Sequence, residues 1–491
     1  MIIKAPKTAK DLAQFHNHGP AFSRRDFLTR AIALGAVGIV GPQLGVSNMA
    51  YAAGLVCPPS SSLVPGGFAQ IYMSGGPAVV PILPLFLSNA VNASTAPVYG
   101  LSGAANLMPA GGNWMTDKTS PWGNVLMAGP AGVNAATWAQ ILKDTYIGGH
   151  YGDLGQDDGT GQDEGLVAGF ALINGKGGPN PKDIHFKTTN VRAAYAVGPT
   201  VAPTALTPTA LAATLQMTPS ATGLTTQADL ASVNTAAVAI EAAYESVKPI
   251  SGIKGGSNLI TAAGCGFNNN PPTASAAYGA ANYVPSGITN ITNLIPATTL
   301  AATGTVMSLQ NQAILAASYQ SALGFNGGVM FTNPNCDYHG AGNQETANQD
   351  QTNANTVVAM LAGFAAAGKP GVIQINSNGF AVSSGVGQAT ITINGTATTV
   401  QSPTAEGDAG GTFSQNLLLF YSPGVVPNVK TLGSINVTTG AVKGATGSPA
   451  NSMVGAAASV LYFLNNGKIP NAFLTASGMS AAQLTPLMCI S

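Results

Sequence analysis

The clearest pattern along the chain is an alternation of short apolar runs with a long helical repeat in its carboxyl-terminal part. Three runs predict buried strands, at Gly328–Thr332, Val372–Asn376 and Leu417–Tyr421, and apolar residues at helical spacing predict a helix over Ala347–Ala367. Strand, helix and strand in this order favour a mostly parallel sheet flanked by helices. The sequence therefore predicts an α/β fold, in which ligands bind at the carboxyl ends of the strands.

Other segments extend this pattern. Phe68–Met73 predicts a further buried strand, and Asn-Gly and Thr-Gly turn sequences predict two β-hairpins, over Thr390–Val400 and Ser434–Val442. The first hairpin interrupts the core pattern, so we expect it to be an insertion. Helical spacing predicts four more helices: Asn134–Ile147, Thr207–Met217, Ala228–Val247 and Met307–Leu323.

Residues 1–52 have the pattern of an export signal of the twin-arginine type. Arg24 and Arg25 precede a weakly apolar run from Ala31 to Val46, which is shorter than the roughly 20 residues of a membrane span. Cleavage after Ala52 would leave residues 53–491, which we expect to form a single α/β domain with insertions and without a membrane span. The protein is expected to be exported by the twin-arginine machinery to the periplasm or the cell exterior.

Charged residues are scarce, at 7% of the chain against about 25% in an average globular protein. Residues 53–491 hold twelve basic and sixteen acidic residues, a formal charge of about −4. Without a basic stripe to neutralise phosphates, the composition disfavours nucleic-acid binding. The low charge also leaves copies of the chain little mutual repulsion, which suggests a self-associating surface component as one structural hypothesis.

Four cysteines follow the expected cleavage point, at Cys57, Cys265, Cys336 and Cys489. In an oxidising compartment an even number of cysteines permits two disulfides. Three connectivities are possible, and the sequence does not separate them. We expect at least one structural bridge.

A carboxylate and an imidazole follow one of the predicted strands directly. Asp337 and His339 come just after Gly328–Thr332, so both side chains could reach one divalent cation, and Gly340 allows the backbone to turn away. The alternative is a turn capped by the aspartate, with the histidine in solvent. Two ligands alone leave both interpretations open.

A second concentration of acidic residues lies in a glycine-rich stretch just after His150. So much negative charge repels itself unless a cation or hydrogen-bond donors offset it, and calcium is the natural candidate. The spacing does not fit an EF-hand loop, and a solubilising surface loop is the alternative. The five acidic residues are Asp153, Asp157, Asp158, Asp163 and Glu164.

Several motifs together resemble the domain-of-unknown-function 1501 family. They are Ile71–Pro77, Asp337–Gln344, Ala365–Pro370, Gly371–Ile375, Asn376–Phe380 and Glu406–Thr412. The family pattern reads Asp-Thr-His-Gly, then an acidic residue with Phe-Gly-Arg-Thr, then Asp-His-Gly. Its members are exported by the twin-arginine route and are distantly similar to alkaline phosphatases and sulfatases. The resemblance covers residues 68–84 and 329–423 and implies an alkaline-phosphatase-like fold.

The departures from the family pattern bear on the activity. The resemblance places Asp337, His339 and Asp408 at metal-ligand positions, and it makes His150 part of a remnant of the catalytic stretch, with Gly149 in place of the nucleophilic serine. Other ligand positions hold residues that do not bind metals well: Pro77, Ala78, Asn378 and Ala409. A two-metal site needs about six or seven ligands. This chain keeps about three, and residues 53–491 contain only three histidines.

The missing metal ligands leave two functional hypotheses, in addition to self-association. The first is a pseudoenzyme with a degenerate metal site, which binds or assembles at or beyond the cell envelope and holds no metal. The second is a mononuclear hydrolase of phosphate or sulfate esters. In that case Asp337, His339 and Asp408 would hold one divalent metal, either zinc, manganese or calcium, that activates a water molecule.

Overall fold

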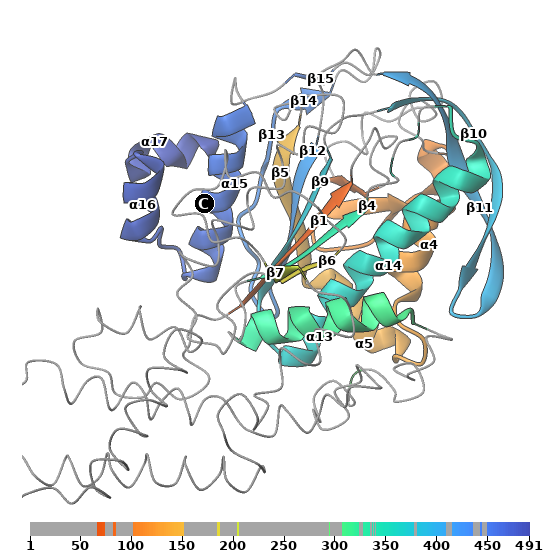
Figure 1. Cartoon of the computed structure of the whole chain (residues 1–491), viewed down its shortest axis with the longest axis horizontal. Helices are drawn as coiled ribbons and strands as arrows, with labels where there is room; N and C mark the ends of the chain where they lie inside the picture. The colour runs from red at the N-terminus through yellow and green to blue at the C-terminus, as the bar shows by residue number, and fades with distance from the viewer. Residues whose placement is uncertain are drawn as a thin grey trace, which may run out of the picture.

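The structure is a computed structural model of the whole chain (Figure 1). It describes residues 66–73, 82–84, 102–151, 184–186, 204–205, 294, 307–323, 328–333, 336, 338, 340–377, 381–408, 415–435, 442–443 and 449–491. The expected signal over residues 1–52 and the helices expected over Thr207–Met217 and Ala228–Val247 lie outside these residues.

The centre of the fold, within these residues, is an eight-stranded sheet with the order β13-β5-β12-β9-β1-β8-β6-β7. The strands are β1 (Gly67–Met73), β5 (Thr145–Tyr151), β6 (Ile184–Phe186), β7 (Thr204–Ala205), β8 (Val329–Asn333), β9 (Gly371–Ser377), β12 (Gln415–Tyr421) and β13 (Thr431–Leu432). In this sheet β12 runs antiparallel to its neighbours, β5 and β9, and the other pairs are parallel. The sheet is therefore mixed but mostly parallel, which confirms the α/β class.

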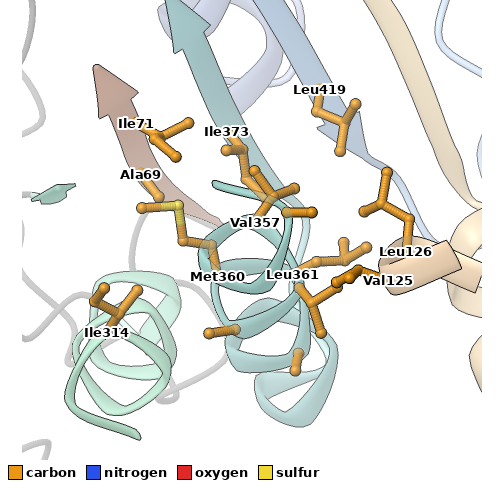
Figure 2. Packing of buried hydrophobic residues seen from close by; sticks show 14 of the residues in the cluster. Ala69, Ile71, Val125, Leu126, Ile314, Val357, Met360, Leu361, Ile373 and Leu419 are labelled. Atoms are coloured by element: carbon orange, nitrogen blue, oxygen red, sulfur yellow. The ribbon is translucent and has the colours of Figure 1, made fainter. Parts of the chain in front are cut away.

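One face of this sheet is covered by the helices α4 (Pro121–Ala128), α5 (Ala135–Lys143), α13 (Leu309–Leu323) and α14 (Asn343–Ala367). α14 lies in the middle of this layer and carries its longest run of buried side chains. Figure 2 shows Met360 pointing toward Ala69 of the sheet and toward α13, while Leu361 points toward Val125 of α4. The helix ends at Gly368, whose left-handed conformation (φ 62°) closes the last turn.

The other face of the sheet packs against the carboxyl-terminal helices (Figure 1). These are α15 (Pro449–Leu464), α16 (Asn471–Ser477), α17 (Ala481–Leu484) and a 3-10 helix, Thr485–Leu487. Phe420 of β12 meets Phe463 of α15 edge to face, with ring centroids 5.1 Å apart. Ser480 begins α17 with a reciprocal capping box to Gln483. These helices were not predicted from the sequence.

Smaller elements surround the sheet. β2 (Ile82–Pro84), β4 (Trp114–Asp117) and β3 (Leu107–Pro109) form a three-stranded antiparallel sheet, and β3 follows a 3-10 helix, Ala104–Asn106. Two hairpins pair β10 (Ala381–Ile393) with β11 (Thr396–Asp408) and β14 (Ser434–Ile435) with β15 (Val442–Lys443). The first hairpin turns at Asn394 and Gly395, both at positive φ, as the Asn-Gly sequence predicts. The strand pairing of both hairpins is therefore confirmed, and the first hairpin is longer than expected. The Thr439-Gly440 turn expected for the second lies outside the described residues.

The expected strands and helices of the core are confirmed with small changes of boundary, except at Asn134–Ile147. There the helix α5 begins after Asn134, whose side chain caps it, and ends at Lys143, and the residues from Thr145 onward form β5. The apolar spacing of Trp138, Ile141 and Leu142 was interpreted correctly, but Tyr146 and Ile147 belong to the strand. β-branched residues favour an extended chain here and two glycines disfavour a helix, and pairing with β12 decides between the two conformations.

Candidate functional site

The carboxyl ends of the parallel strands lie at one edge of the central sheet. β1, β5, β8 and β9 all end there, and β12 begins there because it runs in the opposite direction. In an open α/β sheet this is the edge at which ligands bind. We therefore take it as the candidate site.

One row of residues crosses five strands just inside this edge. His150 is in register with Asn416, Asn416 with Asn376, Asn376 with Tyr72 and Tyr72 with Thr332. Residues in register point to the same face of a sheet, which here is the face covered by the carboxyl-terminal helices. All five are buried, with at most 4% of any of them exposed. The row holds amides, hydroxyls and one imidazole, and it contains no carboxylate, lysine or arginine.

A second pair of amides extends the row toward the middle of the sheet. Gln374 lies in register with Gln70, and both are fully buried. Gln374 Nε2 donates to Asn416 Oδ1 at 2.8 Å, and Gln70 Nε2 donates to Asn376 Oδ1 at 3.0 Å. Each amide is thereby held in one orientation, because its partner is fixed on the neighbouring strand. We call His150, Asn416, Asn376, Tyr72 and Thr332, with Gln70 and Gln374, the polar row.

Not every polar atom of this row is satisfied within the described part of the chain. The Oε1 atom of Gln374 and the hydroxyl of Thr332 are buried without a hydrogen-bond partner there. A buried polar group without a partner costs about 1 to 3 kcal/mol, so such atoms call for water, a ligand or another group. They are the positions at which this row offers hydrogen bonds.

His150 is tied to the carboxyl-terminal segment. Its Nε2 atom lies 2.8 Å from the carbonyl oxygen of Leu487, and the same segment is held at Cys489, whose carbonyl accepts from the backbone of Lys430 at 2.8 Å. The imidazole is 1% exposed. In the sheet order, three strands separate β5 from β8, so His150 lies about 19 Å from Thr332 at the usual strand spacing. His150 is therefore not beside the strand that precedes Asp337 and His339.

On the opposite face, the residues after β8 are anchored to α14 by polar side chains. Asn333 donates to Asn353 Oδ1 at 2.8 Å, and Asn353 in turn donates to the sulfur of Cys336 at 3.2 Å. Tyr338 donates to Asp350 Oδ1 at 2.6 Å. Cys336 and Tyr338 are fully buried, so the neighbours of Asp337 in the sequence are fixed against the helix.

Asp350 is a buried carboxyl in the middle of this network. Burial raises the pKa of Asp350 to about 7, although hydrogen bonds from Tyr338 and from the indole of Trp122 (2.9 Å) partly offset this rise. Burial also raises the pKa of Tyr338 and of Cys336 well above their usual values, so both stay protonated. Asp350 is thus the group of this network that changes charge near neutral pH.

The structure describes only part of the residues predicted to bind metals. Asp337, His339 and the acidic stretch with Asp153, Asp157, Asp158, Asp163 and Glu164 lie outside the described residues. Asp408 is the last residue of β11, where its backbone pairs with Ala381. The described residues contain no cluster of three or more His, Cys, Asp or Glu side chains that could hold a metal ion.

Two of the four cysteines lie among the described residues. Cys336 and Cys489 are buried free thiols in the hydrophobic clusters on opposite faces of the sheet. Cys57 and Cys265 lie outside the described residues, so a disulfide that involves them stays a prediction. Burial raises the pKa of Cys489 to about 12, which keeps this thiol unreactive at neutral pH.

The amides of the polar row and Asp350 are the residues that the sequence reasoning missed. A signal was present in the strands, because Gln70, Gln374 and Asn376 interrupt apolar runs of the kind that normally fill a buried parallel sheet. Asp350 gave no such signal, since it lies in a polar stretch that resembles an exposed helix surface.

Comparison with protein-family models, with curated proteins and with solved structures gives no match to this chain. Among the described residues there is no helix both long and apolar enough to cross a membrane. The function must therefore be argued from the site itself.

Proposed function

We propose that the protein is an exported, non-catalytic binding protein, built on an alkaline-phosphatase-like α/β body whose metal site has degenerated. The observation that carries this proposal is the polar row. At the sheet edge where an α/β enzyme places its reacting groups, the polar row consists of amides, hydroxyls and one imidazole, without a carboxylate.

Metal-dependent ester hydrolysis needs a different set of side chains. A catalytic metal takes at least three protein ligands, mostly carboxylates and imidazoles, and keeps one position open for water. In the polar row, the amides of Gln374 and Gln70 are engaged with Asn416 and Asn376. The imidazole of His150 is engaged with the Leu487 carbonyl. Groups that are engaged in this way are poorly suited to holding a metal ion or activating water.

The departures from the family resemblance support the same conclusion. Asn378 and Ala409 stand where the resemblance implies an acidic ligand and a histidine. His150 is one of three histidines after residue 52, and its contact with the carboxyl-terminal segment gives it a role in the fold. The low charge of the chain agrees with a role in binding or assembly at the envelope or outside the cell.

The alternative is a mononuclear metal-dependent hydrolase of phosphate or sulfate esters. One observation favours it: Cys336 and Tyr338, the described residues on either side of Asp337 in the sequence, are anchored against α14. In this alternative Asp337 and His339 would be two of the metal ligands, and Asp408 would be the third.

A turnover assay separates the two functions. The purified protein is incubated with a panel of phosphate and sulfate monoesters and diesters at saturating zinc, manganese and calcium. We expect no turnover above that of the matched Asp337→Ala variant. Turnover that Asp337→Ala abolishes, and that the exposed α14 variant Glu345→Gln retains, would establish the hydrolase instead.

A further inference from the structure

The hairpin of β10 and β11 forms a sheet of its own, so each strand has one edge that does not pair within the hairpin. Beyond the two-residue turn, hydrogen-bonded and non-hydrogen-bonded pairs alternate. The backbone groups of Thr390 and Thr392 therefore point away from β11. Those of Ala397 and Thr399 point away from β10. The hairpin lies along α14 on the right of Figure 1.

The edge of β10 is closed by side chains of α14. Gln344 accepts from the backbone N–H of Thr390 at 3.0 Å and donates to its carbonyl at 2.7 Å, so its amide replaces a neighbouring strand. Gln351 donates to the carbonyl of Thr392. No further strand can pair at these positions.

The edge of β11 is closed only near its carboxyl end. There the N–H of Gln401 donates to the Thr119 carbonyl at 2.8 Å, and the Pro403 carbonyl accepts from Thr346 at 2.6 Å. At Ala397 and Thr399, no hydrogen bond joins the outward backbone groups to any other described residue. Both residues are exposed. The open edge is the segment Thr396–Val400.

This open edge lacks the features by which proteins usually prevent strand pairing. Natural edge strands are protected by lysine or other charges, by proline or by bulges. The hairpin from Ala381 to Ala405 contains no Lys, Arg, Asp or Glu, and its irregular pairing and its proline lie away from the turn, at residues 382–385 and at Pro403. Threonines dominate the open segment, and threonine pairs well across strands.

We propose that the open edge of β11 binds the same edge of a second copy of this chain, so that the two hairpins form one four-stranded antiparallel sheet. In the symmetric register Ala397 faces Thr399 of the second copy, and Thr398 lies on the two-fold axis. This pairing is self-complementary and closed. Because Gln344 and Gln351 block the other edge, the assembly stops at a dimer.

This inference is independent of the proposed function, since it concerns a surface away from the polar row. The contact involves only the five residues Thr396–Val400 of each copy, which places it at the low end of specific interfaces. We therefore expect a dissociation constant on the order of micromolar. Sedimentation velocity of the purified protein over roughly 1 to 100 μM should therefore show a monomer that converts to a dimer.

Two exposed positions on the same face of the hairpin supply a matched pair of variants. Thr399→Lys places a charge at the open edge, close to the same charge of the second copy, and should weaken the dimer at least about tenfold. Gln388→Lys adds the same charge on β10, away from the open edge, and should leave the dimer intact. Hydrogen exchange at the amides of Ala397 and Thr399 should slow as the concentration rises.

Several results of these experiments would contradict the proposed dimer. A protein that stays monomeric across this range contradicts it, and so does a dimer that Thr399→Lys leaves unchanged. A dimer that both lysine variants weaken equally would place the contact elsewhere. Open-ended assemblies of the wild-type protein would show that the glutamines do not close the second edge.

Discussion

The hydroxyl of Tyr338 donates a 2.6 Å hydrogen bond to Oδ1 of Asp350, which joins the segment after β8 to the middle of α14. The indole of Trp122 donates to the same oxygen from α4. Three parts of the fold therefore meet at one buried carboxyl, and the ionisation of that carboxyl should affect the stability of all three.

Asp350 should make the stability of the protein fall as the pH rises toward neutrality. Burial raises the pKa of Asp350 from 3.8 to about 7, so between these values the native state keeps a proton that the unfolded chain has released. Each such pH unit lowers the free energy of unfolding by about 1.4 kcal/mol. Asp350→Asn removes this dependence.

Urea unfolding at pH 5 and at pH 8 measures the effect. From pH 5 to pH 8 the free energy of unfolding of the wild-type protein should fall by about 2 to 3 kcal/mol more than that of Asp350→Asn. The contributions of other titrating groups cancel in this comparison. Equal losses in the two proteins would contradict a raised pKa at this residue.

Trp122→Phe should destabilise the protein more at pH 8 than at pH 5. At pH 8 the indole of Trp122 donates to an ionised Asp350 carboxylate, and removing this hydrogen bond should lower the free energy of unfolding by about 1.5 to 3 kcal/mol. At pH 5 Asp350 is protonated, and removing the same hydrogen bond should cost about 0.5 to 1.5 kcal/mol. Trp138→Phe is the control. Its indole donates to the neutral carbonyl of Leu126 at 2.6 Å, so its cost should not depend on pH. If the cost of both substitutions depends on pH in the same way, ionisation of Asp350 does not strengthen the hydrogen bond from Trp122.

Gln374 and Asn416 should be energetically coupled. Asn416→Leu leaves the buried Nε2 group of Gln374 without this acceptor, at a cost of about 1 to 3 kcal/mol beyond any effect of packing. In the double variant Gln374→Leu with Asn416→Leu neither amide remains, so part of this cost should be recovered. A double-mutant cycle by chemical denaturation should give a coupling of about 1 kcal/mol or more. Additive single effects would mean that the amide pair contributes nothing.

Gln344→Ala should open the second edge of the hairpin. The variant removes both hydrogen bonds that close the backbone of Thr390, and β10 could then pair with another hairpin. We expect species larger than a dimer in sedimentation velocity at concentrations where the wild-type protein forms only dimers. Glu345→Gln, which changes the neighbouring exposed side chain, should behave as the wild type. A purely dimeric Gln344→Ala protein would show that this side chain does not limit assembly.

The sequence predicted the sheet better than it predicted the site. Apolar runs identified β1, β8, β9 and β12 because a strand buried on both faces needs nearly continuous apolar residues. The turn of the first hairpin was predictable because Asn394 and Gly395 tolerate positive φ. The strand β5 was missed, since Tyr146 and Ile147 continue the helical spacing of α5 and only pairing with β12 makes these residues part of a strand.

The candidate site depended on packing between distant segments. The amino-terminal half of α14 has the composition of an exposed helix, yet Asp350 and Asn353 are buried because the segment after β8 and the helix α4 cover them. Similarly, no local pattern indicates that Gln344 will close a strand edge 46 residues away. These contacts join residues that become neighbours only in the folded chain, so a single sequence gives no signal for them.

The most direct test of the degenerate metal site is a titration of the chelator-treated protein with zinc, manganese and calcium in a calorimeter. We predict no stoichiometric binding with a dissociation constant below about 10 μM that depends on Asp337. Binding of one or two ions per chain that is lost in Asp337→Ala and kept in Glu345→Gln would contradict the proposal and establish a functional metal centre.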